Sequence, residues 1–239
     1  MKTVPRRLSF GAHADAYERA RPDWPEEAAR WLVPDAAVFV VELGAGTGVR
    51  IVAVEPDPRM LGVLRGLGLD GVEGSAEAIP FDDEVADAVV AGSSLHWFEL
   101  EQALPEIHRV LRPGGRFGFG WNHRDERHPA IARMGAAVHE AQARSRGPRW
   151  RSREWAAELT GSGLFRDVEH ALFEHVHELR RDALRDHLMS YSGVAAMSEA
   201  ERKPVLSKVA ALLDADESVS GDGRLRLPFV VTAYRATRV

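Results

Sequence analysis

Acidic residues and glycines near the start of the chain have the spacing of a nucleotide-binding site. Residues 38–43 are apolar apart from Glu42, and glycine then recurs at every second position as far as Gly48. This pattern predicts a buried strand that enters a tight loop, whose main-chain N–H groups can hold a charged ligand. A second apolar run ends in Glu55, and a carboxylate placed there can accept hydrogen bonds from both hydroxyls of a ribose.

The connection between these two predicted strands is shorter than a parallel arrangement needs. Only Val49 and Arg50 separate Gly48 from the second apolar run, whereas a parallel crossover takes roughly a dozen residues or more. Three arrangements are open: a segment lost from the chain, an extended crossing by residues 44–50, or an antiparallel hairpin around the glycines. We favour a lost or deleted helix, because two nearly continuous apolar runs lack the polar face of a typical hairpin strand.

The composition of the chain narrows the range of partners. With 239 residues, 45% of them apolar, the chain can bury one sizeable core, which predicts a single domain over residues 1–239. Its net charge of −5 gives no general attraction to nucleic acid, and no apolar run approaches the roughly 20 residues of a membrane span. The absence of cysteine excludes disulfides and thiolate sites and suits a reducing compartment. We therefore expect a cytoplasmic protein that binds a small molecule rather than nucleic acid or membrane.

Strands and helices are predicted to alternate through the first half of the chain. Residues 12–32 are predicted to form two helical pieces broken at prolines. Apolar periodicity then predicts strands at 71–74, 86–91 and 116–121, helices at 57–67 and 101–111, and a turn at 112–115. This alternation is typical of a doubly wound α/β fold with a mostly parallel sheet. The second half is predicted to contain helices near 129–145, 151–160, 180–190 and 198–213 and strands at 168–176 and 225–235.

Short motifs spread over nearly the whole chain carry a family resemblance. They are Tyr17–Pro22, Glu42–Gly48, Val54–Asp57, Gly74–Phe81, His96–Phe98 and Leu111–Gly115. Together they resemble the class I S-adenosylmethionine-dependent methyltransferases, in the small-molecule branch called type 11-like. The resemblance implies S-adenosylmethionine as cofactor and a seven-stranded sheet with one reversed strand near an edge. It also implies a helical cap at 1–33, a cofactor-binding core at 34–127, and acceptor-side helices, a lid and the last two strands at 128–239.

Carried over position by position, the resemblance implies a cofactor site around the first two strands. The glycines would let the backbone approach the methionine part of the cofactor, with Glu42 near its ammonium group and Glu55 on its ribose. The further residues of this implied site are Gly44, Ala45, Gly46, Gly48, Pro56, Ser75, Ala76, Glu77, Ser93 and Ser94. Of these, Ser75, Ala76 and Glu77 would border the adenine.

In the implied reaction, the main task of the protein is to orient the acceptor. A sulfonium methyl group is already activated, so an acceptor lone pair must be aligned with the S–CH₃ bond, water excluded and, where needed, a proton removed. His96, just past the predicted fourth strand, is the candidate base, because a neutral imidazole takes up a proton near pH 7. A role as pocket wall is equally open for His96. The other implied residues of the acceptor site are Tyr17, Arg21, Trp97, Trp121, Asn122 and His123.

A second class of function is open beside the enzyme. If the helix is truly deleted, the chain could be a methyltransferase-like protein with impaired cofactor binding that acts as a ligand-binding or accessory module, or as a non-methylating catalyst. Retention of Glu42, Glu55 and the glycines favours the enzyme. His175 and His177 share one face of a predicted strand, but no ligand pattern supports a metal site, so we expect an exposed strand face and no metal. A homodimer is the assembly to test.

Overall fold

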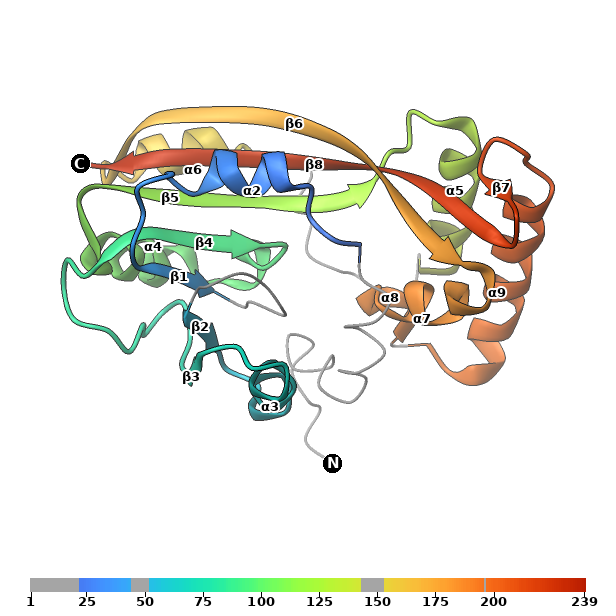
Figure 1. The fold of residues 1–239 in the computed structure, drawn as a ribbon, viewed down its shortest axis with the longest axis horizontal. Coiled ribbons are helices and arrows are strands. Elements are labelled where there is room, and N and C mark those ends of the chain that lie inside the picture. The colour runs from blue at the N-terminus through green and yellow to red at the C-terminus, as the bar shows by residue number, and fades with distance from the viewer. Residues whose placement is uncertain (1–21, 44–51, 143–152, 196) are drawn as a thin grey trace. The chain divides into compact units, whose positions relative to one another are not determined.

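The computed structural model describes residues 22–43, 52–142, 153–195 and 197–239 (Figure 1). The strands are β1 (Val40–Leu43), β2 (Val52–Glu55), β3 (Gly71–Glu73), β4 (Ala86–Gly92), β5 (Leu111–Arg124), β6 (Phe165–Arg180), β7 (Ser220–Gly221) and β8 (Arg224–Arg238). The helices are α2 (Glu26–Leu32), α3 (Pro58–Gly66), α4 (Leu100–Val110), α5 (Pro129–Gln142), α6 (Trp155–Gly161), α7 (Leu184–Met189), α8 (Ser192–Ala195) and α9 (Glu199–Asp214). Short 3₁₀ turns form η3 (Leu95–Trp97) and η5 (Arg181–Ala183).

The strands form one mostly parallel sheet, as predicted. Their order is β3-β2-β1-β4-β5-β8-β6, and the two-residue β7 pairs with β8 in addition. Strands β1 to β5 pair in parallel, whereas the arrow of β8 in Figure 1 runs against those of β5 and β6. The predicted reversed strand beside the strand of 168–176 is therefore confirmed. The order changes direction between β1 and β4, and in open α/β sheets ligands bind at the carboxyl ends of the strands at such a point.

The first two strands run side by side in the same direction. Val41 lies opposite Val52, and Leu43 lies opposite Val54, in a parallel register. The antiparallel hairpin considered from the sequence is therefore wrong. The connection itself, residues 44–51, lies outside the described residues, so the choice between a lost helix and an extended crossing stays a prediction.

The described residues divide into two compact units, which we treat separately. The sheet unit contains the described residues of Trp24–Asn122, Pro148–Phe173 and Val231–Val239. The helical unit contains those of Met1–Asp23, His123–Gly147 and Glu174–Val230, and the long strands β5, β6 and β8 contribute residues to both units. The single domain predicted from the sequence stays a prediction.

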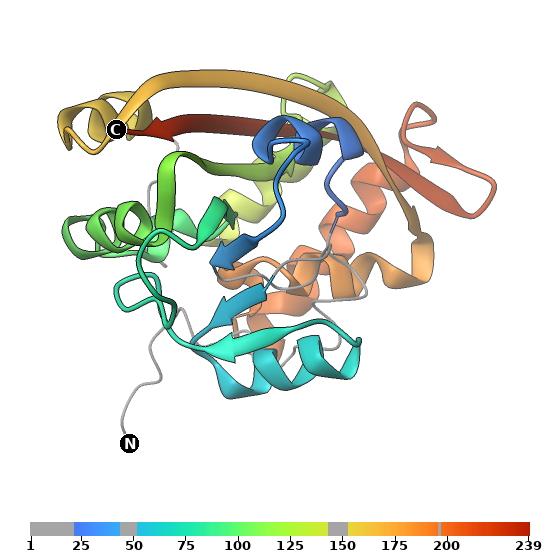
Figure 2. The same cartoon turned by 60° about the vertical axis from the view of Figure 1, so that its left-hand side comes forward.

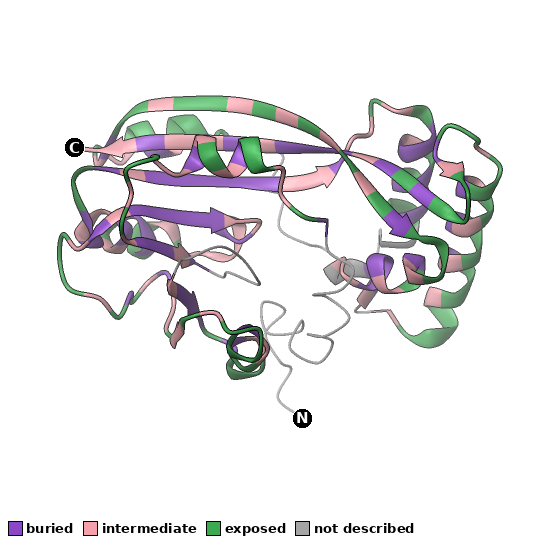
Figure 3. Cartoon of the chain, in the orientation of Figure 1, coloured by how far each residue is buried: buried purple, intermediate pink, exposed green. Residues whose placement is uncertain are grey.

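Both faces of the sheet are covered in the sheet unit. Successive residues of a strand point to opposite faces, and the neighbours Val40 and Val41 belong to different apolar clusters. The cluster of Val40 includes Ala28 of α2, whereas that of Val41 includes Ile107 of α4 and Leu159 of α6. Burial on both faces explains the nearly continuous apolar runs of β1 and β4, which Figure 3 shows as buried. The second predicted piece of the N-terminal cap, α2, thus packs on a sheet face.

Helix α3 follows β2 directly and begins with a capped first turn. The side chain of Asp57 accepts a hydrogen bond from the N–H of Arg59, and Pro58 is the first helical residue. On the buried side of α3, Leu61 and Leu64 are almost fully covered, and Figures 1 and 2 show the helix beside β2 and β3. This helix fixes the direction in which the chain leaves the end of β2.

The predicted turn at 112–115 is instead an irregular start of β5. Ala86 pairs with Leu111 but Ala88 pairs with Arg116, so the segment between them bulges out of the ladder. Gly114 takes the positive φ of 75° that a glycine tolerates, and a Cβ on Gly115 would lie 2.8 Å from the carbonyl oxygen of Arg112. The proline and glycines of residues 112–115 therefore do mark an irregular backbone, but it is a bulge within a strand and not a turn between elements.

The helical unit has its own apolar core. The residues Met134 of α5, Leu188 of α7, Val209 of α9 and Phe229 of β8 are almost fully buried in one cluster. Helix α9 begins with a capping box, in which Ser198 and Glu201 bond each other's main-chain N–H groups. Among the described residues, no helix is long and apolar enough to cross a membrane.

Candidate functional site

The carboxyl ends of β1 and β4 are tied together by a buried serine. The Oγ of Ser94 donates a hydrogen bond of 2.7 Å to the carbonyl oxygen of Leu43, the last residue of β1. Its neighbour Ser93 has a φ of 54°, a strained value for a residue with a side chain, and its N–H donates to the carbonyl of Gly120 at 2.7 Å. Strain of this kind concentrates at functional sites. Both predicted serines therefore lie at the switch point of the sheet.

An aromatic residue that the sequence did not single out lies beside Glu42. A Cβ built on Gly92 would be 3.7 Å from Oε1 of Glu42 and 3.6 Å from Cζ2 of Trp24. A Cβ on Gly120 would be 3.2 Å from Cη2 of the same indole. Trp24 thus lies against the glycines of β4 and β5. The sequence could have indicated such a contact through Gly92 and Gly120, because glycine inside a strand often marks the close approach of another group.

The carboxylate of Glu55 is buried at the end of β2. Its residue is only 9% exposed, and burial raises the pKa of Glu55, although a hydrogen bond from the N–H of Asp57 to Oε1, at 2.8 Å, opposes this shift. Within the described residues, Oε2 receives no hydrogen bond. Burial also acts to raise the pKa of Asp57, but hydrogen bonds from Arg59 outweigh it and hold that pKa below its ordinary value. Of these two acids, Glu55 is therefore the one whose carboxylate has an oxygen left to accept a further hydrogen bond.

The loop predicted to border adenine is fixed by its own side chains. Ala76 is buried in the core of the sheet unit, and Ser75 bridges to Ala78. The Oε1 of Glu77 accepts a hydrogen bond of 3.0 Å from the N–H of Glu99, which precedes helix α4. Glu77 therefore anchors the start of α4, and a contact of these residues with adenine stays a prediction.

Three residues of the predicted acceptor site meet just past β4. Nε1 of Trp121 donates a hydrogen bond of 2.9 Å to Nδ1 of His96, and the rings of His96 and Trp97 lie 4.8 Å apart. Trp121 is 2% exposed and packs against Trp155, with ring centroids 4.8 Å apart. The next residue, Asn122, donates its N–H to Oγ of Ser93 at 3.5 Å. The structure therefore groups His96, Trp97 and Trp121 at the end of β4.

The remaining predicted site residues are not part of this group. Pro56 is exposed, and His123 belongs to the helical unit, where its Nδ1 is 3.2 Å from the carbonyl oxygen of Arg124. The predicted residues outside the described part of the chain are Tyr17, Arg21, Gly44, Ala45, Gly46 and Gly48.

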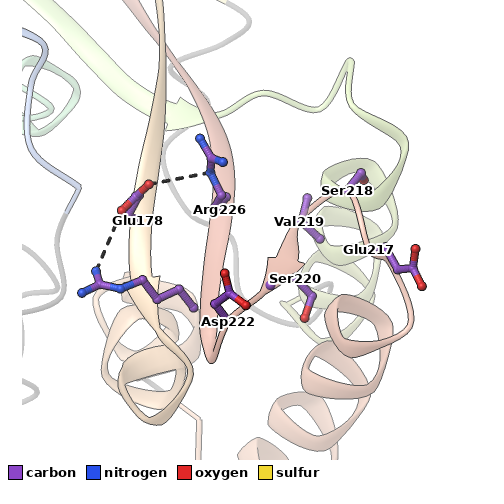
Figure 4. Close-up of a pocket in the computed structure, with 9 residues that line it drawn as sticks. Glu178, Glu217, Ser218, Val219, Ser220, Asp222 and Arg226 are labelled. Carbon is purple, nitrogen blue, oxygen red and sulfur yellow. Dashed lines mark ion pairs between the residues drawn. The ribbon is translucent and has the colours of Figure 1, made fainter.

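The helical unit holds a pocket of its own, with a volume of about 330 Å³ (Figure 4). It lies at the turn between β7 and β8, where Glu178 forms ion pairs with Arg224 at 3.9 Å and Arg226 at 3.7 Å. None of the predicted site residues lines it. Both arginines that line the pocket are therefore paired with Glu178, and within the described ranges no group of three histidine or acidic side chains is arranged to hold a metal.

The two histidines of β6 that the sequence placed on an exposed face point inward instead. His177 lies 5.8 Å from the ring of Phe229 and 5.2 Å from that of His187, which is fully buried. Burial lowers the pKa of both His175 and His177. The expectation of an exposed face is therefore wrong, because the exposed positions of this strand are the alternate ones, such as Val176.

Known proteins resemble this chain in sequence and in fold. Residues 36–119 match the methyltransferase domain family. The chain is 38% identical to an uncharacterized methyltransferase of Mycobacterium tuberculosis, over 96% of each chain. It is 30% identical to a methyltransferase-like protein of Schizosaccharomyces pombe, over 96% of this chain and 95% of that one. A solved structure assigned as a type II methyltransferase from Anaeromyxobacter dehalogenans is similar in fold, with a TM-score of 0.62 and 22% identity over 91% of this chain and 97% of that one. With such identity along almost the whole of its relatives, this chain belongs to the class I S-adenosylmethionine-dependent methyltransferase family.

Proposed function

We propose that this chain transfers the methyl group of S-adenosylmethionine to a small-molecule acceptor by in-line displacement. The observation that carries the proposal is the buried carboxylate of Glu55 at the carboxyl end of β2, beside the parallel strand β1. Removing a carboxylate from water is costly unless its oxygens receive hydrogen bonds, and the two hydroxyls of a ribose can supply them. Membership of the family supports the same cofactor.

The residues at the switch point fit this cofactor. Oε2 of Glu55 has acceptor capacity for a ribose hydroxyl, and the missing Cβ of Gly92 leaves room beside the carboxylate of Glu42, where an ammonium group would be stabilised. When bound, S-adenosylmethionine supplies a methyl group that is already activated. The tasks of the chain are then to orient the acceptor and exclude water, for which the partly exposed Trp24 and Trp97 offer apolar surface.

Two facts favour the second candidate, a methyltransferase-like module with impaired cofactor binding. Residues 44–51 are all that connects two parallel strands, which leaves no length for a crossover helix of ordinary size. The alignment with the Mycobacterium tuberculosis relative spans 242 positions, more than the 239 residues of this chain, which requires gaps on this side. Both facts are consistent with a deleted helix, and that helix would have contributed main-chain N–H groups to an anionic part of the ligand.

Calorimetric titration of the purified chain with S-adenosylmethionine separates the two candidates. Micromolar affinity with one-to-one stoichiometry supports the enzyme, whereas no heat up to millimolar ligand contradicts it and favours the module. The intact mass of the same sample is the control, because a polypeptide of 26.4 kDa has the short connection and a heavier one has a longer connection.

A further inference from the structure

Strand β6 ends the sheet and leaves one long edge without a described partner strand. It is the last strand in the order of the sheet and runs for 16 residues, whereas an average strand has about five or six. Figure 1 shows no described strand on its outer side. Native proteins often protect such an edge with lysine or proline, and β6 contains neither. The main chain of this edge is therefore able to pair with another strand.

One face of β6 exposes apolar side chains next to charged ones. From residue 170 to residue 178 the even-numbered positions are exposed and the odd-numbered ones are partly buried, as Figure 3 shows. Leu172 is 54% and Val176 is 49% exposed, and they are two of the five large apolar side chains that are exposed in the described part of the chain. His170 lies on the same face, where its ring is 4.7 Å from that of Tyr234. The open edge thus borders a face with apolar surface that an added strand would cover.

The sequence of this face is self-complementary about Leu172. Two copies of the strand that pair in antiparallel about a two-fold axis at Leu172 place each residue opposite the one equally far on the other side. Leu172 then faces the partner's Leu172, and Val168 faces the partner's Val176. His170 faces the partner's Glu174, whose carboxylate can accept a hydrogen bond from the imidazole. Every position of the face from 168 to 176 therefore meets a side chain of matching chemistry.

Neighbouring registers that keep the same face together lack this match. An axis at Glu174 brings two carboxylates opposite each other, which is destabilising in a sheet. Axes at Phe173 and Ala171 set Glu174 against an apolar side chain. In the register about Leu172, Glu174 keeps its ion pair with Arg127, in which Oε1 is 2.6 Å from the guanidinium, and Oε2 accepts from the partner's His170. The pattern of side chains thus selects one register.

We propose that two copies of this chain form a homodimer by antiparallel pairing of residues 168–176 of β6 about a two-fold axis at Leu172. The pairing joins the two sheets into one continuous sheet. A contact of this kind uses the same patch on both copies, so it closes with two chains and does not grow into a fibre. One strand from each copy is a small interface, so we expect a dissociation constant that is roughly micromolar. Dimerisation is independent of the proposed methyl transfer.

Sedimentation equilibrium of the full chain measures the assembly. Between roughly 1 and 100 µM, the mass should rise from near 26.4 kDa toward twice that value. Leu172→Lys puts two ammonium groups on the axis and should keep the chain monomeric over this range. Leu67→Lys is the matched control, because Leu67 is 51% exposed at the end of α3, and this variant should dimerise like the wild type. A wild-type chain that stays at 26.4 kDa, or a Leu172→Lys variant that still dimerises, would overturn the proposal.

The absence of cysteine from the chain allows the register to be tested directly. Opposed residues of an antiparallel pair have Cα atoms about 4.5–5.5 Å apart, which a disulfide can span. In Leu172→Cys the two thiols meet on the axis, so mild oxidation should convert the dimer to a covalent one. Val176→Cys is the control and should stay uncrosslinked, because its two thiols are roughly 26 Å apart along the strands. No crosslink in Leu172→Cys, or equal crosslinking of both variants, would contradict the proposed pairing.

Discussion

The carboxylate of Glu55 lies at the end of β2 with only 9% exposure, and burial raises its pKa above that of an ordinary glutamate. A group whose pKa is raised by folding destabilises the folded state increasingly as the pH rises above its unfolded-state pKa, and to the full extent above the raised pKa. The same carboxylate, when ionised, is the better acceptor for ribose hydroxyls. At the residue scale, Glu55 should therefore lower the stability of the ligand-free chain and increase its affinity for the cofactor.

Glu55→Gln should reverse both effects. Gln keeps the acceptor for the N–H of Asp57 but cannot ionise, so we expect a thermal midpoint higher by roughly 1–3 °C near neutral pH and much weaker binding of S-adenosylmethionine. The stability gain should vanish below about pH 4.3, where the glutamate is protonated in the folded and unfolded chain alike. Calorimetric scans over this pH range measure it.

The control for Glu55→Gln is Glu101→Gln, an exposed position in the first turn of α4. It should change neither the affinity for S-adenosylmethionine nor the difference in midpoint between acidic and neutral pH. A Glu55→Gln variant that is less stable than wild type near neutral pH would contradict this account of the carboxylate.

The affinity for S-adenosylmethionine should also depend on pH through the carboxylate of Glu55. Because the pKa of Glu55 is raised, affinity for S-adenosylmethionine should weaken as the pH falls through that raised value, at which point the carboxylate takes up a proton. Titrations of the wild type at a series of pH values measure this. The pH dependence should be absent from Glu55→Gln, and an identical dependence in both proteins would assign it to another group.

At the scale of elements, the glycines of β4 and β5 have separate tasks. A Cβ on Gly120 would lie 2.5 Å from the carbonyl oxygen of Thr232, which is main chain and cannot move aside. A Cβ on Gly92 has ordinary distances of 3.6 Å or more, but its neighbours are Trp24 and Glu42. The first glycine allows strands to approach, and the second leaves room at the proposed site.

Alanine substitutions at these two glycines should therefore differ in effect. Gly120→Ala should lower the free energy of unfolding by about 1–3 kcal/mol, because the main chain must shift. Gly92→Ala should change it by less than about 1 kcal/mol while weakening the binding of S-adenosylmethionine. Denaturant unfolding and calorimetric titration of the two variants provide the comparison. Equal effects of both variants on binding and stability would contradict the distinction.

The inward histidines of β6 should make the helical unit sensitive to acid. Burial lowers the pKa of His177, with Asp23 opposing, so the unfolded chain binds protons more readily than the folded one. The free energy of unfolding should keep its full value above the histidine pKa of the unfolded chain, about 6.5, and should fall as the pH drops below it. His177→Phe, which cannot titrate, should lose less stability than wild type between about pH 7 and pH 5. Denaturant unfolding at both pH values tests this, and equal losses would contradict it.

The elements themselves were largely predictable because their apolar periodicity is strong. The helix predicted at 101–111 appears as Leu100–Val110, and the strand at 86–91 as Ala86–Gly92. What could not be predicted depends on tertiary contacts. Pairing with β4 draws residues 111–115 into β5, and the packing of Phe229 turns His177 inward. The position of Trp24 could not be predicted for the same reason, because it depends on contacts with glycines in two strands that are distant in the sequence.

At the scale of the whole molecule, the connection 44–51 is shorter than the crossover that usually joins two parallel strands. The strands on either side are parallel, and Glu42 and Glu55 are retained at their ends. Parallel pairing was predictable from the apolar runs, whereas the path of the connection was not, because sequence spacing alone fits several arrangements. If a helix has been deleted here, its loss should therefore affect affinity for the cofactor more than the fold.

Restoring the connection should strengthen cofactor binding. A variant that carries the corresponding segment of the Mycobacterium tuberculosis relative between Gly48 and Ile51 regains a helix N-terminus near the ligand, which is worth roughly tenfold in affinity. A Gly/Ser segment of equal length is the control and should bring no gain. Calorimetric titration compares the three chains, and an unchanged affinity in the helical graft would show that the lost segment is not what limits binding.

A crystal structure of the chain with S-adenosylhomocysteine tests the central claim most directly. The account predicts both ribose hydroxyls within hydrogen-bond distance of the Glu55 carboxylate and the amino-acid part of the ligand at the ends of β1 and β4, near Glu42 and Gly92. A ligand bound elsewhere, for example in the pocket beside Glu178, or a switch point filled by side chains of the protein itself, would contradict it.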